Sequence, residues 1–432
     1  MYIGLSEGWV ERVEEAAPDC VLLTVRLGCV AWRGRTGPGT SDAAPAKAIA
    51  YPSLLAVVPS VGHRVLLNTT AVDLGLGSGG YHFVIAVSPE VDKPVRQARD
   101  TELGQAAGDP GDAGPRGVAE EVVPRPSGHI MKLRYTPFQF ACLAAEEAGG
   151  AAHEGLGEFA GLGGTPVVCC ELHSQVPAVA AGAAQITGGR ARVTYVMTDG
   201  GALPAAFSRL TREMRAAGLV HRVITCGQAF GGDLEAINIY SALASARILG
   251  DSDVIITGMG PGLAGTGTPL GFSGVEQGQA LNAAASLGGL PVAVPRLSFA
   301  DPRGRHYGVS HHTSSVLGKV CLAPCVLAMP RLPEEAANVI YSDGTDSERL
   351  AVRGHLTLVE EGSPGLEYLA QVGIRPTAMG RGVREDPEFF LAASAAGRVA
   401  GKLSKVLSGL PAPAGVHALS RKAKPGTAGS IR

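Results

Sequence analysis

The chain has 432 residues, of which 45% are hydrophobic and 18% charged, with a formal net charge of −2. Because a single core rarely grows beyond roughly 250–300 residues, this length predicts two or three domains. Apart from Arg421, Lys422 and Lys424 in the tail, the lysines and arginines are scattered along the chain, which argues against nucleic acid as a partner. The opening residues carry acids where an export signal needs bases, and no stretch reaches the roughly 18 apolar residues of a membrane helix. We therefore expect a cytoplasmic protein without a membrane segment.

Residues 1–91 predict a small β domain. Four short segments rich in β-branched and aromatic residues lie there, separated by glycine, proline and asparagine without an intervening helical period. Such close spacing is typical of a small β-barrel or β-sandwich. Residues 92–127 hold glycine, proline, alanine and charges but almost no large apolar residue, so they predict a flexible linker or loop.

Residues 128–408 predict an α/β domain, whose core at residues 165–330 carries the clearest pattern. Helical segments alternate there with five apolar runs: PVVCCEL, ARVTYVMTD, VHRVITCG, SDVIITGMG and LPVAVPRLSF. Strands that are apolar on both faces, with helices between them, indicate a doubly wound, mainly parallel sheet covered on both sides. The order of the strands in that sheet cannot be read from the sequence.

The flanks of this core predict helices. Thr136 followed by Pro137 is an N-cap and first-turn pair, which predicts a helix beginning there. Asp386 followed by Pro387 predicts a second helix start, and the small residues on one face of that helix predict close packing against a neighbour. Residues 409–432 are expected to form a disordered tail.

Polar residues follow every one of the five apolar runs. In open parallel sheets ligands bind beyond the carboxyl ends of the strands, because loops and helix N-termini meet there. Five such strand ends in a row exceed what helix capping requires, so we predict one composite small-molecule site. Asp233 also precedes a predicted helix, which fits a capping role. The expected rim of the site comprises Glu171, His173, Asp199 and Asp233.

The glycine-rich loop, residues 257–274, is the strongest local signal. Its glycines and hydroxyls can present several N–H and O–H groups to one anion, such as a phosphate or a carboxylate. No lysine follows as a P-loop requires, and the spacing is not the dinucleotide fingerprint. A loop whose glycines only allow tight backbone packing is the alternative. The residues expected to contact the anion are Thr257, Gly258, Gly260, Gly262, Gly265, Thr266 and Gly267.

The histidine loop, residues 301–315, is where we expect the chemistry. Imidazole and carboxylate groups suit either a general acid/base pair or a divalent metal ion. The spacing matches no zinc signature, and hydrogen bonding to neighbouring loops is the alternative role for the histidines. Arg303 and Arg305 suit an anionic substrate, because guanidinium pairs bidentately with carboxylate or phosphate; solvated surface arginines are the alternative. The catalytic candidates are His306, His311, His312 and Asp301.

The eight cysteines include no C-x-x-C pair. In a reducing compartment most are expected to be small core residues. The spacing of Cys321 and Cys325 would suit part of a metal site, but no second cluster in the sequence supports one. Cys226, next to a glycine at a strand end, is better placed for catalysis than Cys169 or Cys170, but it is a weaker candidate than the histidines.

Long motifs spread along the chain resemble a bacterial family known as domain of unknown function 3866. The motifs include GHIMKLRYTPFQ, MTDGGALP, AFGGDLEAINIYSAL, GMGPGLAGTGTPLGFSGVEQG, FADPRGRHYGVSHHTSSVLG and AMGRGVREDPEFF. The resemblance covers nearly the whole chain. It implies no reaction, cofactor or catalytic residue.

Two functions fit these patterns. The first is an enzyme that acts on a small anionic metabolite, phosphorylated or nucleotide-like, with acid/base or metal-assisted chemistry. The alternative is a non-catalytic ligand-binding or regulatory module whose N-terminal β domain contacts a partner. The density of titratable residues at the strand ends favours the enzyme. The chain is also a candidate for forming a homo-oligomer, which these patterns neither predict nor exclude.

Overall fold

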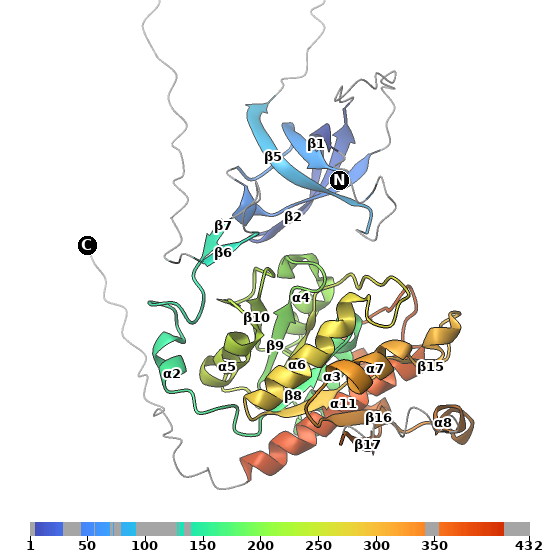
Figure 1. Ribbon diagram of the computed structural model, residues 1–432. Helices are drawn as coiled ribbons and strands as arrows, with labels where there is room; N and C mark the ends of the chain where they lie inside the picture. The colour runs from blue at the N-terminus through green and yellow to red at the C-terminus, as the bar shows by residue number, and fades with distance from the viewer. Residues whose placement is uncertain are drawn as a thin grey trace, which may run out of the picture.

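The computed structural model describes residues 5–28, 45–55, 57–69, 72, 79–91, 128, 130–133, 140–341 and 354–409. Figure 1 shows a small barrel, in blue, beside a larger layered α/β domain. The predicted linker at 92–127, Thr136 with Pro137, and the predicted tail beyond residue 409 lie outside the described residues. No helix within the described part of the chain is both long and apolar enough to cross a membrane.

The N-terminal β domain is a closed five-stranded barrel, which confirms the predicted β architecture. Its first strand was not foreseen, because two bulges in that strand interrupt the alternation of apolar and polar residues. Val10, Leu23, Val25 and Leu67 fill the barrel interior. In barrel order the strands are β1 (Leu5–Ala17), β2 (Cys20–Leu27), β3 (Ala46–Ala50), β5 (Tyr81–Val91) and β4 (His63–Asn68).

The α/β domain is built on one eight-stranded sheet, and every pairing in it is parallel. The predicted doubly wound parallel sheet is therefore confirmed. The central strands are buried along their whole length, as their apolar runs indicated. In sheet order the strands are β11 (Leu234–Ala236), β10 (Arg222–Cys226), β9 (Val193–Thr198), β12 (Val254–Met259), β8 (Pro166–Cys169), β13 (Leu290–Ala293), β16 (Val326–Pro330) and β17 (Leu356–Glu360).

Helices cover both faces of the sheet, and each face has its own hydrophobic core. Successive side chains of a strand point to opposite faces, so Ile255 joins one core and Ile256 the other. Figure 1 shows α5 and α6 in front of the sheet. One face carries α3 (Val176–Thr187), α4 (Arg209–Ala216), α10 (Ser363–Gln371) and α11 (Pro387–Ser408). The other carries α5 (Ile239–Gly250), α6 (Glu276–Ser286) and the π-helix η6 (Val316–Val320), which follows α7 (His311–Ser315).

The long helix α11 packs closely on α3, as its small residues predicted. A Cβ atom added at Gly397 would lie 1.9 Å from the carbonyl oxygen of Val179. One added at Gly182 would lie 2.3 Å from the carbonyl oxygen of Ser394. Only glycine allows the two backbones to approach this closely, so this helix pair depends on both positions.

A β-hairpin stands where a helix was expected after Pro137. Phe140–Cys142 forms β7, which pairs with β6 (Ile130–Lys132). Lys132 is fully buried, and its ammonium group donates to the carbonyl oxygens of Gly227 at 2.8 Å and Ala229 at 2.9 Å. The same ammonium group pairs with the Glu235 carboxylate at 3.2 Å. The buried charge thus attaches the hairpin to the edge of the sheet, a long-range contact that local helix signals could not reveal.

The interpretation of Asp233 as a helix cap is wrong. The helix that follows begins at Ile239, and Asn238 is its N-cap, accepting from the backbone N–H groups of Tyr240 and Ser241. The residues between Asp233 and that cap include the short edge strand β11. Three residues are too few to show a strand period in the sequence.

The barrel packs against the loop that follows β9. Tyr51 and Ile49 of the barrel form a small apolar cluster with Ala206. The Phe83 ring lies 6.4 Å from the ring of Phe207. The barrel therefore lies on the side of the α/β domain where this strand ends, and Figure 1 shows it next to α4.

Candidate functional site

The strand order identifies where a ligand site should form. β8 and β12 are neighbours at the centre of the sheet. From β8 the chain runs through α3 to β9, and from β12 it runs through α6 to β13 on the other side of β8. These two helices cover opposite faces. The two connections therefore diverge at the carboxyl ends of β8 and β12, the switch point at which open α/β sheets form a crevice.

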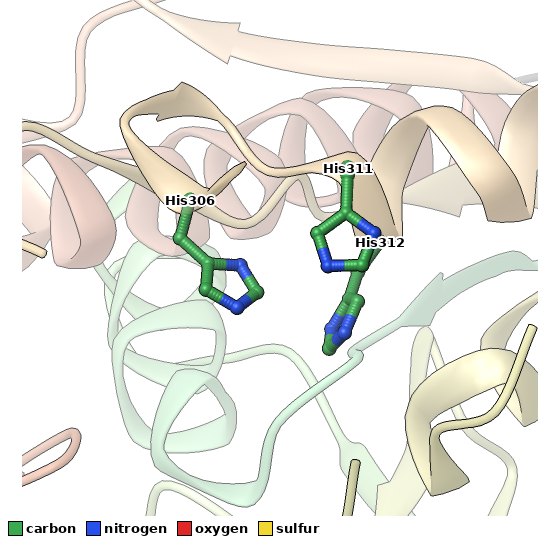
Figure 2. A group of neighbouring side chains, drawn as sticks. All are labelled: His306, His311 and His312. Atoms are coloured by element: carbon green, nitrogen blue, oxygen red, sulfur yellow. The ribbon is translucent and has the colours of Figure 1, made fainter. Parts of the chain in front are cut away.

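Three histidines from the histidine loop converge near this point. His306 ends the short 3-10 helix Gly304–His306, and His311 and His312 begin α7. One nitrogen from each ring lies within 4.8 Å of the nitrogens of the other two. Figure 2 shows the three rings close together, all projecting from this one segment. The ring centroids are 4.4–5.0 Å apart. We call these residues the three-histidine cluster.

Two of the rings are held by contacts at Nδ1. The Nδ1 atom of His306 lies 2.7 Å from the hydroxyl oxygen of Ser310. That hydroxyl also caps α7 by accepting from the backbone N–H of His312. His312 donates from Nδ1 to Oε1 of Glu171 at 2.6 Å. Neither of these contacts involves the Nε2 atoms of His306 and His312, and Nε2 of His311 is buried without a hydrogen-bond partner among the described residues.

Two imidazoles of the cluster, His306 and His311, are held in their neutral form at physiological pH. Burial is the main cause that lowers the pKa of His306 to about 3, and the charges of Arg296 and Arg303 act in the same direction. Burial is also the main cause that lowers the pKa of His311, and electrostatic interaction with His312 and Arg305 adds to it. Neutral imidazole is the form that binds a metal ion.

Glu171 connects the cluster to the centre of the sheet. It follows β8, is fully buried, and lies 3.4 Å from the Arg296 guanidinium, which is itself 4% exposed. Its second carboxylate oxygen has no hydrogen-bond partner among the described residues. Sequence reasoning missed Arg296, although a single charge inside the run LPVAVPRLSF was the available signal.

Asp301 is surrounded by arginines. Arg303 donates to its two oxygens at 2.9 and 2.7 Å, and hydrogen bonds from Arg303 hold the pKa of Asp301 well below its usual range. Arg296 and Arg381 lie 3.6 and 3.5 Å from the same carboxylate. The arrangement keeps Asp301 ionised and fixes the guanidinium groups beside the cluster, while its catalytic role stays a prediction. A small polar hollow beside it is lined by residues that include Arg296, Ser298, Arg381 and Asp386.

The glycine-rich loop covers the three-histidine cluster. The Phe272 ring stacks on the ring of His312, with centroids 3.7 Å apart and planes 2° apart. At the exposed tip, the Thr266 hydroxyl donates to the carbonyl oxygen of Gly271, and the Gly271 N–H donates to Thr268. Several groups expected to hold an anion are thus engaged within the loop, and its anion-binding role stays a prediction.

The seven residues predicted to contact that anion lie in two settings. Thr257 and Gly258 lie inside β12, and Thr257 is fully buried. Gly260 is packed so closely that an added Cβ would lie 2.3 Å from the carbonyl oxygen of Ala202. The backbone of Gly262 and Gly267 has positive φ, which glycine tolerates. Gly262, Gly265, Thr266 and Gly267 belong to the part of the loop beyond the strand.

The predicted rim residues converge only in part. His173 is buried away from the three-histidine cluster, with Nε2 2.6 Å from the Ser208 hydroxyl, and burial lowers its pKa to about 4. Asp199 is exposed and accepts from the backbone N–H of Gln228. Asp233 lies at the amino end of β11, the opposite end of the sheet, and it accepts from the backbone N–H of Val223.

Glu276 is a second residue that sequence reasoning missed. It is the first residue of α6, directly after the glycine-rich loop. Acidic residues are common in the first turn of a helix, so nothing in the sequence singled it out. Thr198, at the end of β9, donates to its carboxyl group. Burial raises the pKa of Glu276 to about 7, and the nearby Asp199 charge acts in the same direction. A carboxyl group with this pKa can take up or release a proton near neutral pH.

A family model described as "Protein of unknown function (DUF3866)" matches residues 47–397. The match spans well over half of the chain, so the chain belongs to this family, as its motifs indicated. Comparison with curated proteins and with solved structures found no match.

Proposed function

We propose that this member of the DUF3866 family is a metal-dependent enzyme whose three-histidine cluster holds a divalent, zinc-type ion. The observation that carries the proposal is the convergence of three imidazole nitrogens within 4.8 Å of one another. Three histidines leave one coordination position of zinc open, and there the ion supplies Lewis-acid activation of water or of a polar substrate group.

The geometry of the cluster supports a metal ion in two ways. Zinc–nitrogen bonds of about 2.0–2.1 Å place tetrahedral ligand nitrogens about 3.3 Å apart, so small ring rotations close the observed spacing. Ligating histidines usually donate their other N–H to a carboxylate or another oxygen. Glu171 holds His312 in this manner, and the Ser310 hydroxyl contacts His306.

A small anionic metabolite, phosphorylated or nucleotide-like, is the proposed substrate class. Arg305 is exposed directly beside His306, and its charge is close enough to lower the pKa of His311. Arg303 is half-exposed beside the same cluster. Guanidinium groups bind phosphate and carboxylate bidentately, and the cluster with its ion adds positive charge. Glu276 is our candidate for proton transfer.

The proposal places the enzyme in the cytoplasm, with a small-molecule substrate and without a nucleic-acid partner. It leaves a homo-oligomer open. A non-catalytic ligand-binding or regulatory module is the alternative outcome of the test.

Zinc content and turnover test the proposal together. We would load the full chain with zinc, measure bound zinc, and follow phosphate release from a panel of phosphomonoesters and nucleotides. His311→Ala should lose one zinc ion per chain and all turnover, with little change in the melting temperature of the zinc-free chain. The matched control is His153→Ala, at an exposed histidine on α2 (His153–Gly157), which should retain both.

Two results would change the conclusion. If His311→Ala binds as much zinc as the unmodified chain, the ion is not held by the three-histidine cluster and this part of the proposal is wrong. If zinc binds and panel compounds raise the melting temperature without turnover, the chain is a ligand-binding module and not an enzyme on these substrates.

A further inference from the structure

We propose a second metal site, in which Cys321, Cys325 and His355 bind a structural zinc ion in the core of the α/β domain. One ligand atom from each of the three residues lies within 4.8 Å of the other two, and all three side chains are buried. This inference does not rest on the proposed function, because the two sites share no residue.

The distances suit a zinc ion. The sulfur of Cys325 lies 3.3 Å from Nδ1 of His355. Zinc–sulfur and zinc–nitrogen bonds of about 2.3 and 2.0–2.1 Å place these two atoms about 3.6 Å apart in a tetrahedral site. The two cysteines are not joined by a disulfide. A cation can therefore enter between the ligand atoms with only small side-chain movements.

The imidazole of His355 is oriented for metal binding. Its Nε2 lies 3.0 Å from the carbonyl oxygen of Leu317, which accepts only, so the ring proton is on Nε2. The lone pair on Nδ1 then faces Cys325 and accepts from its backbone N–H at 3.3 Å, a hydrogen bond that a bound ion would replace. A ligating histidine whose other nitrogen donates to a backbone carbonyl is a recurrent arrangement in zinc proteins.

Buried thiols and an imidazole together select a soft or borderline cation. Such ligands favour Zn²⁺ or Cu⁺ over Mg²⁺ and Ca²⁺, and structural zinc sites are built from cysteine and histidine. A hydrogen bond with Cys321, together with burial, raises the pKa of Cys325, so its thiol stays protonated without a cation.

The location of the site indicates a structural role. Cys325 directly precedes β16, His355 directly precedes β17, and Cys321 directly follows η6. The ligands therefore lie at the amino ends of two parallel strands, whereas the three-histidine cluster follows the carboxyl end of β13. An ion there would join the edge strand β17 to β16 and hold the far end of the segment that carries His311 and His312.

Cobalt substitution of the full chain tests this site separately from the three-histidine cluster. Only thiolate ligands give a sulfur-to-cobalt charge-transfer band in the near ultraviolet, so the unmodified chain should show the band. Cys325→Ser should abolish it and remove one zinc ion per chain, and His355→Asn should reduce zinc content in the same way. His311→Ala should keep the band. The matched control is Cys20→Ser, at a buried barrel thiol, which should change neither the band nor the zinc content.

The unmodified chain alone can overturn the proposal even if the variants fail to fold. Absence of the charge-transfer band after cobalt loading would do so. Mass spectrometry showing a disulfide between Cys321 and Cys325 in the freshly purified chain would also contradict a zinc site.

Discussion

At the scale of single residues, the hydrogen bond between Glu171 and His312 is the contact on which the proposed zinc site most depends. It joins residues 141 positions apart and so links the end of β8 to the start of α7. A carboxylate behind a ligating imidazole fixes its tautomer and raises its basicity. The contact therefore both positions the ring and strengthens it as a ligand.

Glu171→Gln should weaken zinc binding about 10- to 100-fold, the range found when such partners of metal ligands are lost. The amide keeps the shape of the side chain but removes its charge. Competition with a chromophoric chelator measures the affinity. Glu276→Gln, at a partly buried carboxyl group that accepts from Thr198, is the control and should bind zinc normally. Equal affinities for the two variants would show that Glu171 does not support the ion.

The depressed pKa of His306 predicts how stability depends on pH in the zinc-free chain. The pKa is about 3 in the folded chain and about 6.5 when unfolded. Between these values the unfolded chain binds a proton here that the folded chain does not, so the free energy of unfolding falls as pH is lowered through this window.

His306→Asn should make that fall less steep between about pH 4.5 and 6.5, a range above most carboxyl titrations. Chemical denaturation at several pH values measures it. His153→Asn replaces an exposed histidine and should keep the original slope. A slope unchanged by His306→Asn would mean that His306 is protonated as readily in the folded as in the unfolded chain.

At the scale of elements, Gly397→Ala tests the packing of α11 on α3. Alanine favours a helix by up to about 1 kcal/mol over glycine. The added methyl group would lie 1.9 Å from the Val179 carbonyl oxygen, and such overpacking costs typically 1–3 kcal/mol. We expect the clash to dominate and the free energy of unfolding to fall. Gly157→Ala has no atom within 4 Å of the new methyl group and should not destabilise. Equal stability of both variants would contradict the close packing.

Lys132→Met tests how the β6–β7 hairpin is attached to the sheet. Methionine leaves the Glu235 carboxylate and several carbonyl oxygens without their buried cation, and breaking such a pair from one side costs about 3–5 kcal/mol. Thermal and urea unfolding measure the loss. Arg209→Met breaks an exposed ion pair with Glu213, so it should cost below about 1 kcal/mol. A similar small loss for Lys132→Met would mean that the hairpin is held by other contacts.

At the scale of the whole molecule, local patterns sufficed for the architecture. The five apolar runs correspond to β8, β9, β10, β12 and β13. The small residues after Asp386 also indicated the close helix pair. Elements of three residues, such as β7 and β11, were missed because they are too short to show a period and are fixed by contacts far along the chain.

The site was less accessible to sequence reasoning. The histidine loop was recognisable because its histidines are adjacent in the chain. Arg296 and Glu276 lie in segments whose patterns predict a strand and a helix, so neither was recognised as a site residue. His355 lies 30 residues beyond Cys325, too far along the chain for a short motif to join them. The insertion of β12 between β8 and β9 decides which strand ends are neighbours. The sequence predicted Asp233 on the rim of the site. In the structure its loop runs back to the amino end of the sheet, and no local signal in the sequence marks that return.

Zinc-edge anomalous diffraction from crystals of the zinc-loaded chain tests the central claim most directly. We predict an anomalous peak bonded to His306, His311 and His312, with zinc–nitrogen distances of about 2.0–2.1 Å. Glu171 should still accept the hydrogen bond from His312. No peak at the three-histidine cluster, with the rings hydrogen-bonded to protein groups through the nitrogens we assign to the ion, would contradict the metal-dependent enzyme proposed for this chain.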